Sequence, residues 1–225
     1  MATNLDIQAS IALYQTRLGP KARYASFDYC YNYFQSFREK GDPGALAHDA
    51  QLQTSCLQLG FYLASWGMLR GSSVLLQRSV RNFVPVIKAI SRMPPEVWTI
   101  DTNDYSLVQR EALLDAIRRI RNAFPESASD ILVTKTMLGV FGCIPAFDQY
   151  FKKGFGVHTV SLRSLDKIGA FYEEHAQAIE SHRVPTLSFE SGNPTARIYP
   201  RAKVIDMIFF VTGGGSAIRA ELPPP

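Results

Sequence analysis

The segment Leu57–Leu69 reads L-Q-L-G-F-Y-L-A-S-W-G-M-L, and Arg70-Gly71-Ser72-Ser73 follows it directly. Apart from Gln58 and Ser65, its residues are apolar, aromatic or small. A helix that is apolar on nearly all sides belongs in a protein interior, with neighbours around it. The segment therefore predicts a buried central helix from about His48 to Arg70, and an all-α fold whose other helices pack around it.

Small residues form a regular stripe along this predicted helix. Gly60, Ala64, Gly67 and Gly71 recur at helical spacing, so they share one face. Each glycine costs a helix about 1 kcal/mol relative to alanine. We therefore expect a neighbouring helix to approach this face closely.

Helical patterns continue through most of the chain, and caps, glycines and prolines divide it into about eight to ten helices. Beyond the central segment, the expected helices cover residues 4–19, 23–40, 74–93, 103–124, 131–141, 145–154, 161–182 and 200–213. The expected start signals are Thr102 or Asn103, Pro145 in a first turn, Ser161 or Ser164, and a capping box at Ser127–Asp130. Residues 183–200 have loop composition, and Gly213–Gly215 is expected to end the last helix. Pro85 either kinks the helix after Ser73 or opens a new one.

The second predicted helix carries many aromatic residues. Tyr24, Phe27, Tyr31 and Phe34 follow one helical stripe. Such a stripe suits either base stacking or burial against two neighbouring helices, and we favour burial because core helices commonly carry it.

Composition indicates a globular protein. Of 225 residues, 46% are hydrophobic and 20% are charged, and the net charge is +4. We expect one domain over residues 1–220 and a disordered tail at 221–225. The chain has no apolar run long enough for a membrane span, and it begins with no secretory signal pattern. Cys30, Cys56 and Cys143 lie in apolar surroundings, which predicts free buried thiols and a cytoplasmic location.

The sequence indicates no metal or cofactor. Gly213–Ser216 lacks the lysine of a phosphate-binding loop, and His175 and His182 lack metalloprotease spacing. No motif for nucleophilic catalysis is visible.

Three charged residues lie in apolar surroundings: Arg70, Asp148 and Asp206. A buried charge needs an opposite partner or a water-filled cleft. We expect Arg70 to pair with Asp148 or Asp206 and to hold helices in register. The functional alternative is a shared cleft in which these residues bind a ligand.

The sequence T-K-T-M-L at 134–138, followed by I-P-A-F-D at 144–148, resembles the helix-hairpin-helix DNA glycosylase family. In that family a lysine and a downstream aspartate lie beside the extruded base. The resemblance implies that Lys135 and Asp148 are catalytic. The sequences L-A-S-W-G-M-L-R-G-S-S and Y-P-R-A-K-V-I-D-M are similar to those of uncharacterised bacterial proteins, which implies a bacterial origin and no particular activity.

Two functional classes follow, and enzymatic activity is left open. The first is a nucleic-acid-associated protein with a mildly basic cleft near Lys135. Its ligand-binding residues would be Arg70, Ser72, Lys152, Lys153 and Asp206. The alternative is a non-catalytic helical protein that acts through protein contacts or as a homo-oligomer. Salt-dependent binding to DNA or RNA distinguishes the two classes.

Overall fold

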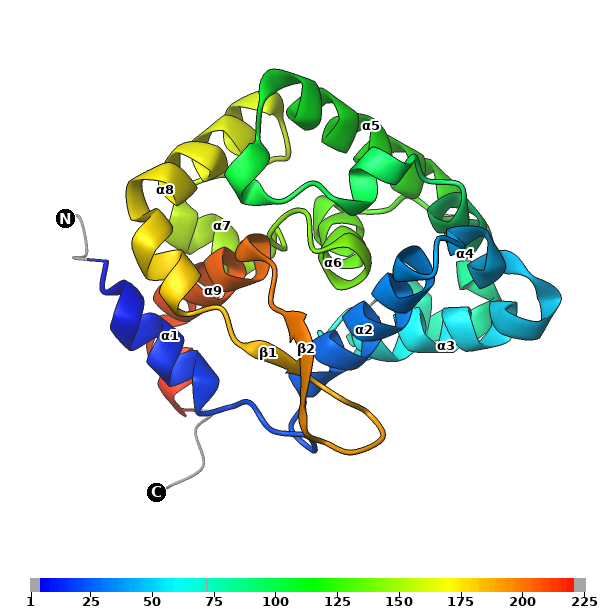
Figure 1. The fold of residues 1–225 in the computed structure, drawn as a ribbon, viewed down its shortest axis with the longest axis horizontal. Coiled ribbons are helices and arrows are strands. Elements are labelled where there is room, and N and C mark those ends of the chain that lie inside the picture. Colours follow the sequence, from blue (N-terminus) through cyan, green and yellow to red (C-terminus); the bar gives the residue numbers. More distant parts are fainter. Residues whose placement is uncertain (1–4, 72, 221–225) are drawn as a thin grey trace.

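The computed structural model describes residues 5–71 and 73–220, with side chains described as far as Gly214. Helices dominate this part of the chain, so the predicted all-α class is confirmed (Figure 1). The α-helices in the described residues are α1 (Ile7–Gln15), α2 (Ala25–Glu39), α3 (Asp49–Ser65), α4 (Val84–Ser91), α5 (Leu107–Ala123), α6 (Asp130–Phe141), α7 (Gln149–Phe155), α8 (Leu162–Ser181) and α9 (Arg201–Ala220). Short 3-10 helices are η1 (Pro43–Ala47), η2 (Val74–Gln77), η3 (Val80–Phe83), η4 (Pro95–Trp98) and η5 (Thr102–Asp104). Ser72 and the predicted disordered tail lie outside the described residues.

The buried central helix is α6, not the predicted segment. Every residue from Leu132 to Phe141 is buried. Helices α2, α3 and α5 all contact α6, which lies near the middle of the ribbon (Figure 1). Ser129 caps its first turn, in place of the predicted capping box over Ser127–Asp130, and Gly142 ends it with a left-handed conformation at φ 69°. The connection from Gly142 to Asp148 is buried as well.

Helix α3 is shorter and more exposed than predicted. It ends at Ser65, and Gly67 takes a left-handed φ of 78°. The Gly67 N–H donates to the Ala64 carbonyl, and the Met68 N–H donates to the Leu63 carbonyl. These paired bonds form a glycine-dependent helix stop. Gly67 and Gly71 therefore lie beyond the helix, and the predicted stripe does not continue past α3.

The closest helix contact is between α7 and α9. A Cβ added at Gly213 would lie 1.9 Å from the Tyr150 carbonyl oxygen, and one at Gly154 would lie 2.8 Å from the Phe209 oxygen. Only glycine permits such an approach of two backbones. Helix α9 consequently continues through Gly213–Gly215, where the sequence predicts a stop, because this packing outweighs the low helix propensity of glycine.

Residues 183–200 form a hairpin in place of the expected loop. Strands β1 (Pro185–Leu187) and β2 (Pro194–Ile198) are antiparallel, with Leu187 opposite Pro194. Side chains of β2 alternate between exposed and half-buried, so the strand lacks a strong apolar pattern. Asp28 on α2 holds the hairpin, because its carboxylate accepts the Leu187 N–H at 2.9 Å and the Tyr199 hydroxyl at 2.6 Å.

Several local predictions are confirmed. The aromatic stripe of α2 is buried, all three cysteines are free and buried, and Ser161 forms a capping box with Ser164. Pro85 opens α4. Two predicted helix starts are wrong: Ser106 caps α5 in place of Thr102 or Asn103, and Asp148, not Pro145, begins α7.

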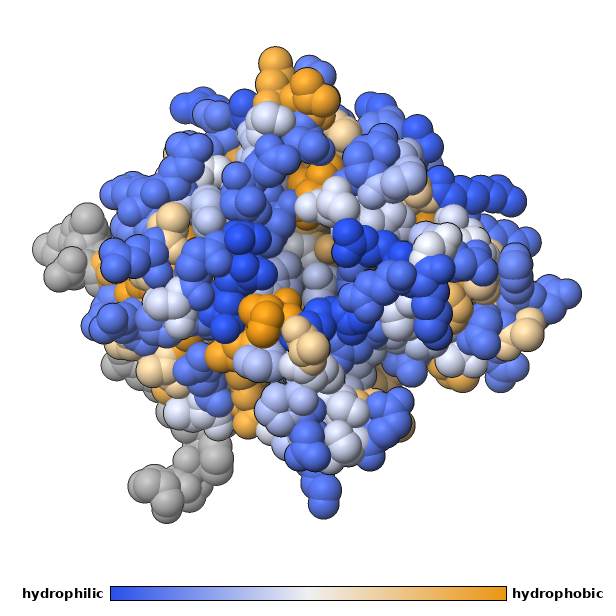
Figure 2. Space-filling model, in the orientation of Figure 1, coloured by the Kyte–Doolittle hydropathy of each residue, from blue (hydrophilic) through white to orange (hydrophobic). Residues whose placement is uncertain are grey.

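The surface drawn in Figure 2 is mostly hydrophilic. Its apolar groups form small separate patches, one of them at the upper edge over α5. In that helix Leu107 and Val108 are exposed. Isolated apolar residues of this kind are ordinary on a protein surface.

Candidate functional site

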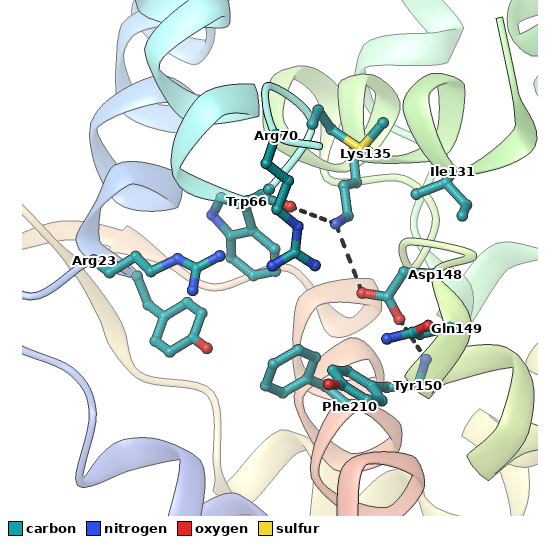
Figure 3. Close-up of a pocket in the computed structure, with 12 residues that line it drawn as sticks. Arg23, Trp66, Arg70, Ile131, Lys135, Asp148, Gln149, Tyr150 and Phe210 are labelled. Atoms are coloured by element: carbon teal, nitrogen blue, oxygen red, sulfur yellow. Dashed lines mark hydrogen bonds and ion pairs between the residues drawn. The ribbon is translucent and has the colours of Figure 1, made fainter. Parts of the chain in front are cut away.

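A pocket of about 260 Å³ lies where the end of α3 meets the start of α2, α6 and α7 and the middle of α9 (Figure 3). Its charged lining residues are Arg23, Arg70, Lys135 and Asp148. Its aromatic lining residues are Tyr24, Trp66, Tyr150 and Phe210. The pocket therefore combines flat apolar walls with both signs of charge, as small-molecule sites commonly do.

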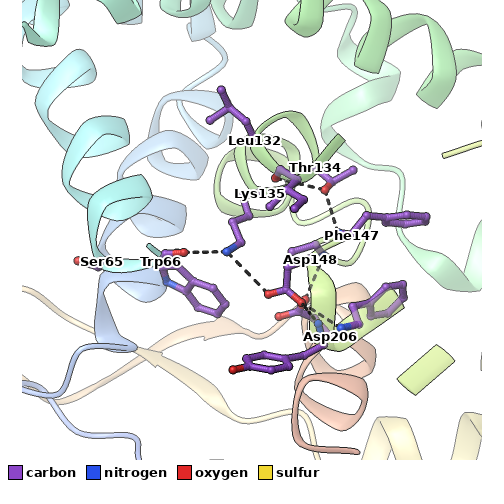
Figure 4. Close-up of polar contacts among 12 residues, drawn as sticks. Ser65, Trp66, Leu132, Thr134, Lys135, Phe147, Asp148 and Asp206 are labelled. Carbon is purple, nitrogen blue, oxygen red and sulfur yellow. Dashed lines mark hydrogen bonds and ion pairs between the residues drawn. The ribbon is translucent and has the colours of Figure 1, made fainter. Parts of the chain in front are cut away.

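Lys135 comes from the buried helix α6 and is 6% exposed. Its Nζ donates to the Trp66 carbonyl oxygen at 2.7 Å and lies 3.7 Å from Asp148 Oδ2 (Figure 4). Burial lowers the pKa of Lys135, and the nearby Asp148 carboxylate opposes that shift. The site thus holds an amine that loses its proton more readily than a surface lysine does.

Asp148 is held by the helix that it begins. Its Oδ1 accepts the backbone N–H groups of Tyr150 and Phe151, both at 3.0 Å. This capping arrangement leaves Oδ2 directed at Lys135 (Figure 4). A carboxylate fixed in this way can accept a proton from a group bound beside the lysine.

The connection that carries Asp148 is fixed from both sides. Thr134 Oγ1 on α6 accepts the Phe147 N–H at 2.8 Å, and Asp206 Oδ1 on α9 accepts the Ala146 N–H at 3.0 Å. Asp206 is 2% exposed and does not line the pocket. Asp206 therefore supports the connection behind Asp148, which agrees with the structural interpretation of its sequence, and it is not a lining residue as the ligand-binding alternative requires.

Lys203 is a buried residue that the sequence reading missed. Its Nζ lies 3.2 Å from Asp206 Oδ2, 2.9 Å from the Tyr14 hydroxyl and 4.1 Å from the centre of the Trp66 ring. Burial lowers the pKa of Lys203 and raises that of Asp206, while each charge favours the other. The lysine therefore supports Trp66 from behind. The spacing of K-V-I-D at 203–206, one helical turn, was the available signal.

Arg70 lines the pocket but is exposed. The predicted ion pair of Arg70 with Asp148 or Asp206 is wrong, because among the described residues Lys135 and Lys203 pair with these two carboxylates. The reason is that α3 ends before Arg70, which leaves this side chain at the mouth and not in the interior.

Of the predicted cations, Lys135 and Arg70 line the pocket and two others do not. Lys152 is half-buried and Lys153 is exposed in the last turn of α7, and neither lines the pocket. Arg23 lines it instead, with its Nε donating to the Ser65 carbonyl oxygen. Arg23 and Lys135 thus bind carbonyls at the end of α3, where helix carbonyls lack partners within the helix. Nothing local in the sequence marks Arg23, because the contact joins two segments far apart in the chain.

No protein-family model, curated protein or solved structure matches this chain. Within the described residues, no helix is both long enough and apolar enough to cross a membrane.

Proposed function

We propose that this protein binds nucleic acid and takes one unpaired base into the pocket between α3, α6 and α7. The observation that carries the proposal is the Lys135–Asp148 pair, which lies inside a pocket walled by aromatic rings. Stacking between aromatic side chains and polar contacts to the base edge are the means by which proteins hold an extruded base. The pair supplies a donor and an acceptor for that edge.

The mouth of the pocket favours a polyanion. Arg23 and Arg70 both line it, and Arg70 is exposed. Guanidinium groups bind phosphate oxygens through paired hydrogen bonds. A strand whose phosphates contact these arginines would bring a base to the aromatic walls.

The proposal has a catalytic version, in which Lys135 acts as a nucleophile in the pocket. Burial lowers the pKa of this amine, and its Nζ uses a proton to bond the Trp66 oxygen, so the neutral amine keeps its lone pair for attack. At the aldehyde carbon of an abasic deoxyribose, the nitrogen would form a C=N bond with loss of water. Asp148 would accept the proton that the attacking amine releases and return it to the former carbonyl oxygen, which leaves as water.

Binding is tested by fluorescence anisotropy with a labelled 12-nucleotide DNA at several salt concentrations. We expect Arg70→Gln to weaken binding and to reduce the slope of log K against log salt by about 1. Arg118→Gln is the matched control, because Arg118 is an exposed arginine on α5 outside the pocket. Absence of binding by the parent at low salt, or equal slopes for the two variants, would contradict the proposal.

The catalytic form is tested by borohydride trapping on DNA that contains one abasic site. We expect the parent to form a covalent adduct, Lys135→Gln to form none, and the exposed-lysine control Lys153→Gln to behave like the parent. Binding without any adduct in the parent would remove the catalytic form and leave the binding function.

A further inference from the structure

A second hollow of about 520 Å³ lies beside the pocket, between the start of α2 and the outer face of α3. The aromatic residues that line it are Tyr29, Phe61 and Phe189, and the cations are Lys21 and Arg23. Arg23 lines both hollows, and the adjacent residues Ser65 and Trp66 line one each. The two hollows therefore adjoin each other at Arg23.

Two aromatic rings in this groove are unusually exposed. Phe61 on α3 is 69% exposed, and Phe189, in the turn between β1 and β2, is 73% exposed. The ring of Phe189 stands edge-on to Tyr29, with centroids 5.3 Å apart. Exposed apolar residues that are scattered singly need no explanation, but two large rings in one groove indicate a binding surface.

The charge of the groove selects the chemistry of its ligand. Its described lining residues include two cations and no carboxylate. Arg23 is held between groove and pocket by its bond to the Ser65 carbonyl, and its guanidinium lies 5.6 Å from the centre of the Tyr24 ring. Lysine is depleted in the cores of protein–protein interfaces, whereas cations interleaved with aromatic rings are typical of surfaces that bind single-stranded nucleic acid.

We infer that the substrate is single-stranded nucleic acid, whose bases next to the one in the pocket stack on Phe61 and Phe189 while phosphates pass Lys21 and Arg23. The inference rests on the proposed function and narrows its substrate class. A duplex cannot use these rings, because the faces of its bases are already stacked on one another.

The experiment compares a labelled 12-nucleotide single strand with the corresponding blunt duplex by anisotropy. The parent should bind the single strand at least about tenfold more tightly, and Phe61→Ala and Phe189→Ala should each weaken that binding by roughly 5- to 150-fold. Because both changes remove stacking and no charge, the salt slope should stay the same. Val108→Ala is the control, since Val108 is 73% exposed on α5 and lines neither hollow.

The outcomes separate the two proposals. Equal binding of single strand and duplex, with both phenylalanine variants like the parent, would overturn the inference and leave the proposed function intact. Failure of the parent to bind either form would reject the proposed function itself. A parent dimer in sedimentation that Phe61→Ala dissociates, without any change in nucleic-acid binding, would identify the groove as a protein interface and also overturn the inference. Thermal melts of both variants check that they fold.

Discussion

Helices α3 and α6 both contain apolar stretches, denser in α6, and they occupy different environments. Every residue of α6 from Leu132 to Phe141 is buried, whereas α3 exposes Leu57 and Phe61. Neighbours surround α6 on several sides, while the outer face of α3 borders two surface hollows. An apolar sequence therefore indicates a preference for burial, and whether neighbouring elements cover every face of the helix decides whether that preference is met.

The two helices also differ in how they treat polar groups. Helix α6 buries Thr134, Lys135 and Thr136 in succession, and each has a hydrogen-bond partner. In the segment that follows α3, in contrast, Arg70 is exposed. Buried polar groups are retained where their bonds are satisfied. The candidate site lies where the interior of α6 opens to the surface beside α3.

The largest change in the free energy of unfolding is expected when the buried Lys203–Asp206 pair behind the site is broken. Asp206→Ala would leave the fully buried Lys203 without the carboxylate that lies 3.2 Å away, and would remove the acceptor of the Ala146 N–H. Loss of one partner of a buried pair costs about 3–5 kcal/mol of unfolding free energy. Arg70→Ala, at an exposed position, should change it by no more than about 0.5 kcal/mol. Urea unfolding measures both.

A milder variant keeps this comparison measurable if Asp206→Ala does not fold. Asp206→Asn retains an oxygen for the Ala146 N–H and removes only the charge. It should therefore lower the free energy of unfolding by less than Asp206→Ala does. Equal stability of Asp206→Ala and Arg70→Ala would show that the buried Lys203–Asp206 pair contributes no more to the free energy of unfolding than a surface arginine does.

Local features of the fold could be predicted from sequence because short-range chemistry determines them. The Ser161 cap of α8 and the aromatic stripe of α2 both depend on residues within a few positions of one another. The lysine and the aspartate of T-K-T-M-L and I-P-A-F-D could also be selected, and the structure places them 3.7 Å apart in one pocket. Their catalytic role stays a prediction.

The remaining features depend on contacts between distant segments. Gly213 lies in a helix only because the backbone of α7 packs against it, and β1–β2 is held by Asp28 more than 150 residues earlier. The position of Arg23 in the pocket likewise depends on the end of α3. Sequence spacing cannot reveal such contacts within a single chain.

The second effect concerns Asp28, a buried carboxylate that hydrogen bonds hold. Burial raises the pKa of Asp28 to about 6, although the bonds from Tyr199 and Leu187 oppose the shift. The folded state therefore binds a proton more tightly than the unfolded state. The contribution of Asp28 to the free energy of unfolding should fall by about 3 kcal/mol as pH rises from about 4 to about 6, and then stay constant.

Asp28→Asn isolates this contribution, because the amide does not titrate. Urea unfolding at several pH values should show the parent losing stability relative to the variant across that window. A stability difference that is independent of pH would mean that the carboxylate ionises in the folded protein as it does in water.

The smallest change in stability is expected for alanine substitutions at glycines of α3 and α6. At Gly139 on α6, an added Cβ would lie 2.3 Å from the Tyr62 ring, which is fully buried and is anchored by its hydroxyl bond to the Lys135 carbonyl. Gly139→Ala should therefore cost about 1–3 kcal/mol by overpacking, reduced by the roughly 1 kcal/mol helix preference of alanine. At Gly60 on α3, the nearest atom is the edge of the Phe83 ring at 3.1 Å, which needs to move only a few tenths of an ångström. At Gly60 the small overpacking cost and the helix preference of alanine nearly cancel, so Gly60→Ala should have a melting temperature close to that of the parent. A greater loss at Gly60 than at Gly139 would show that α3, and not α6, is the helix with the tighter surroundings.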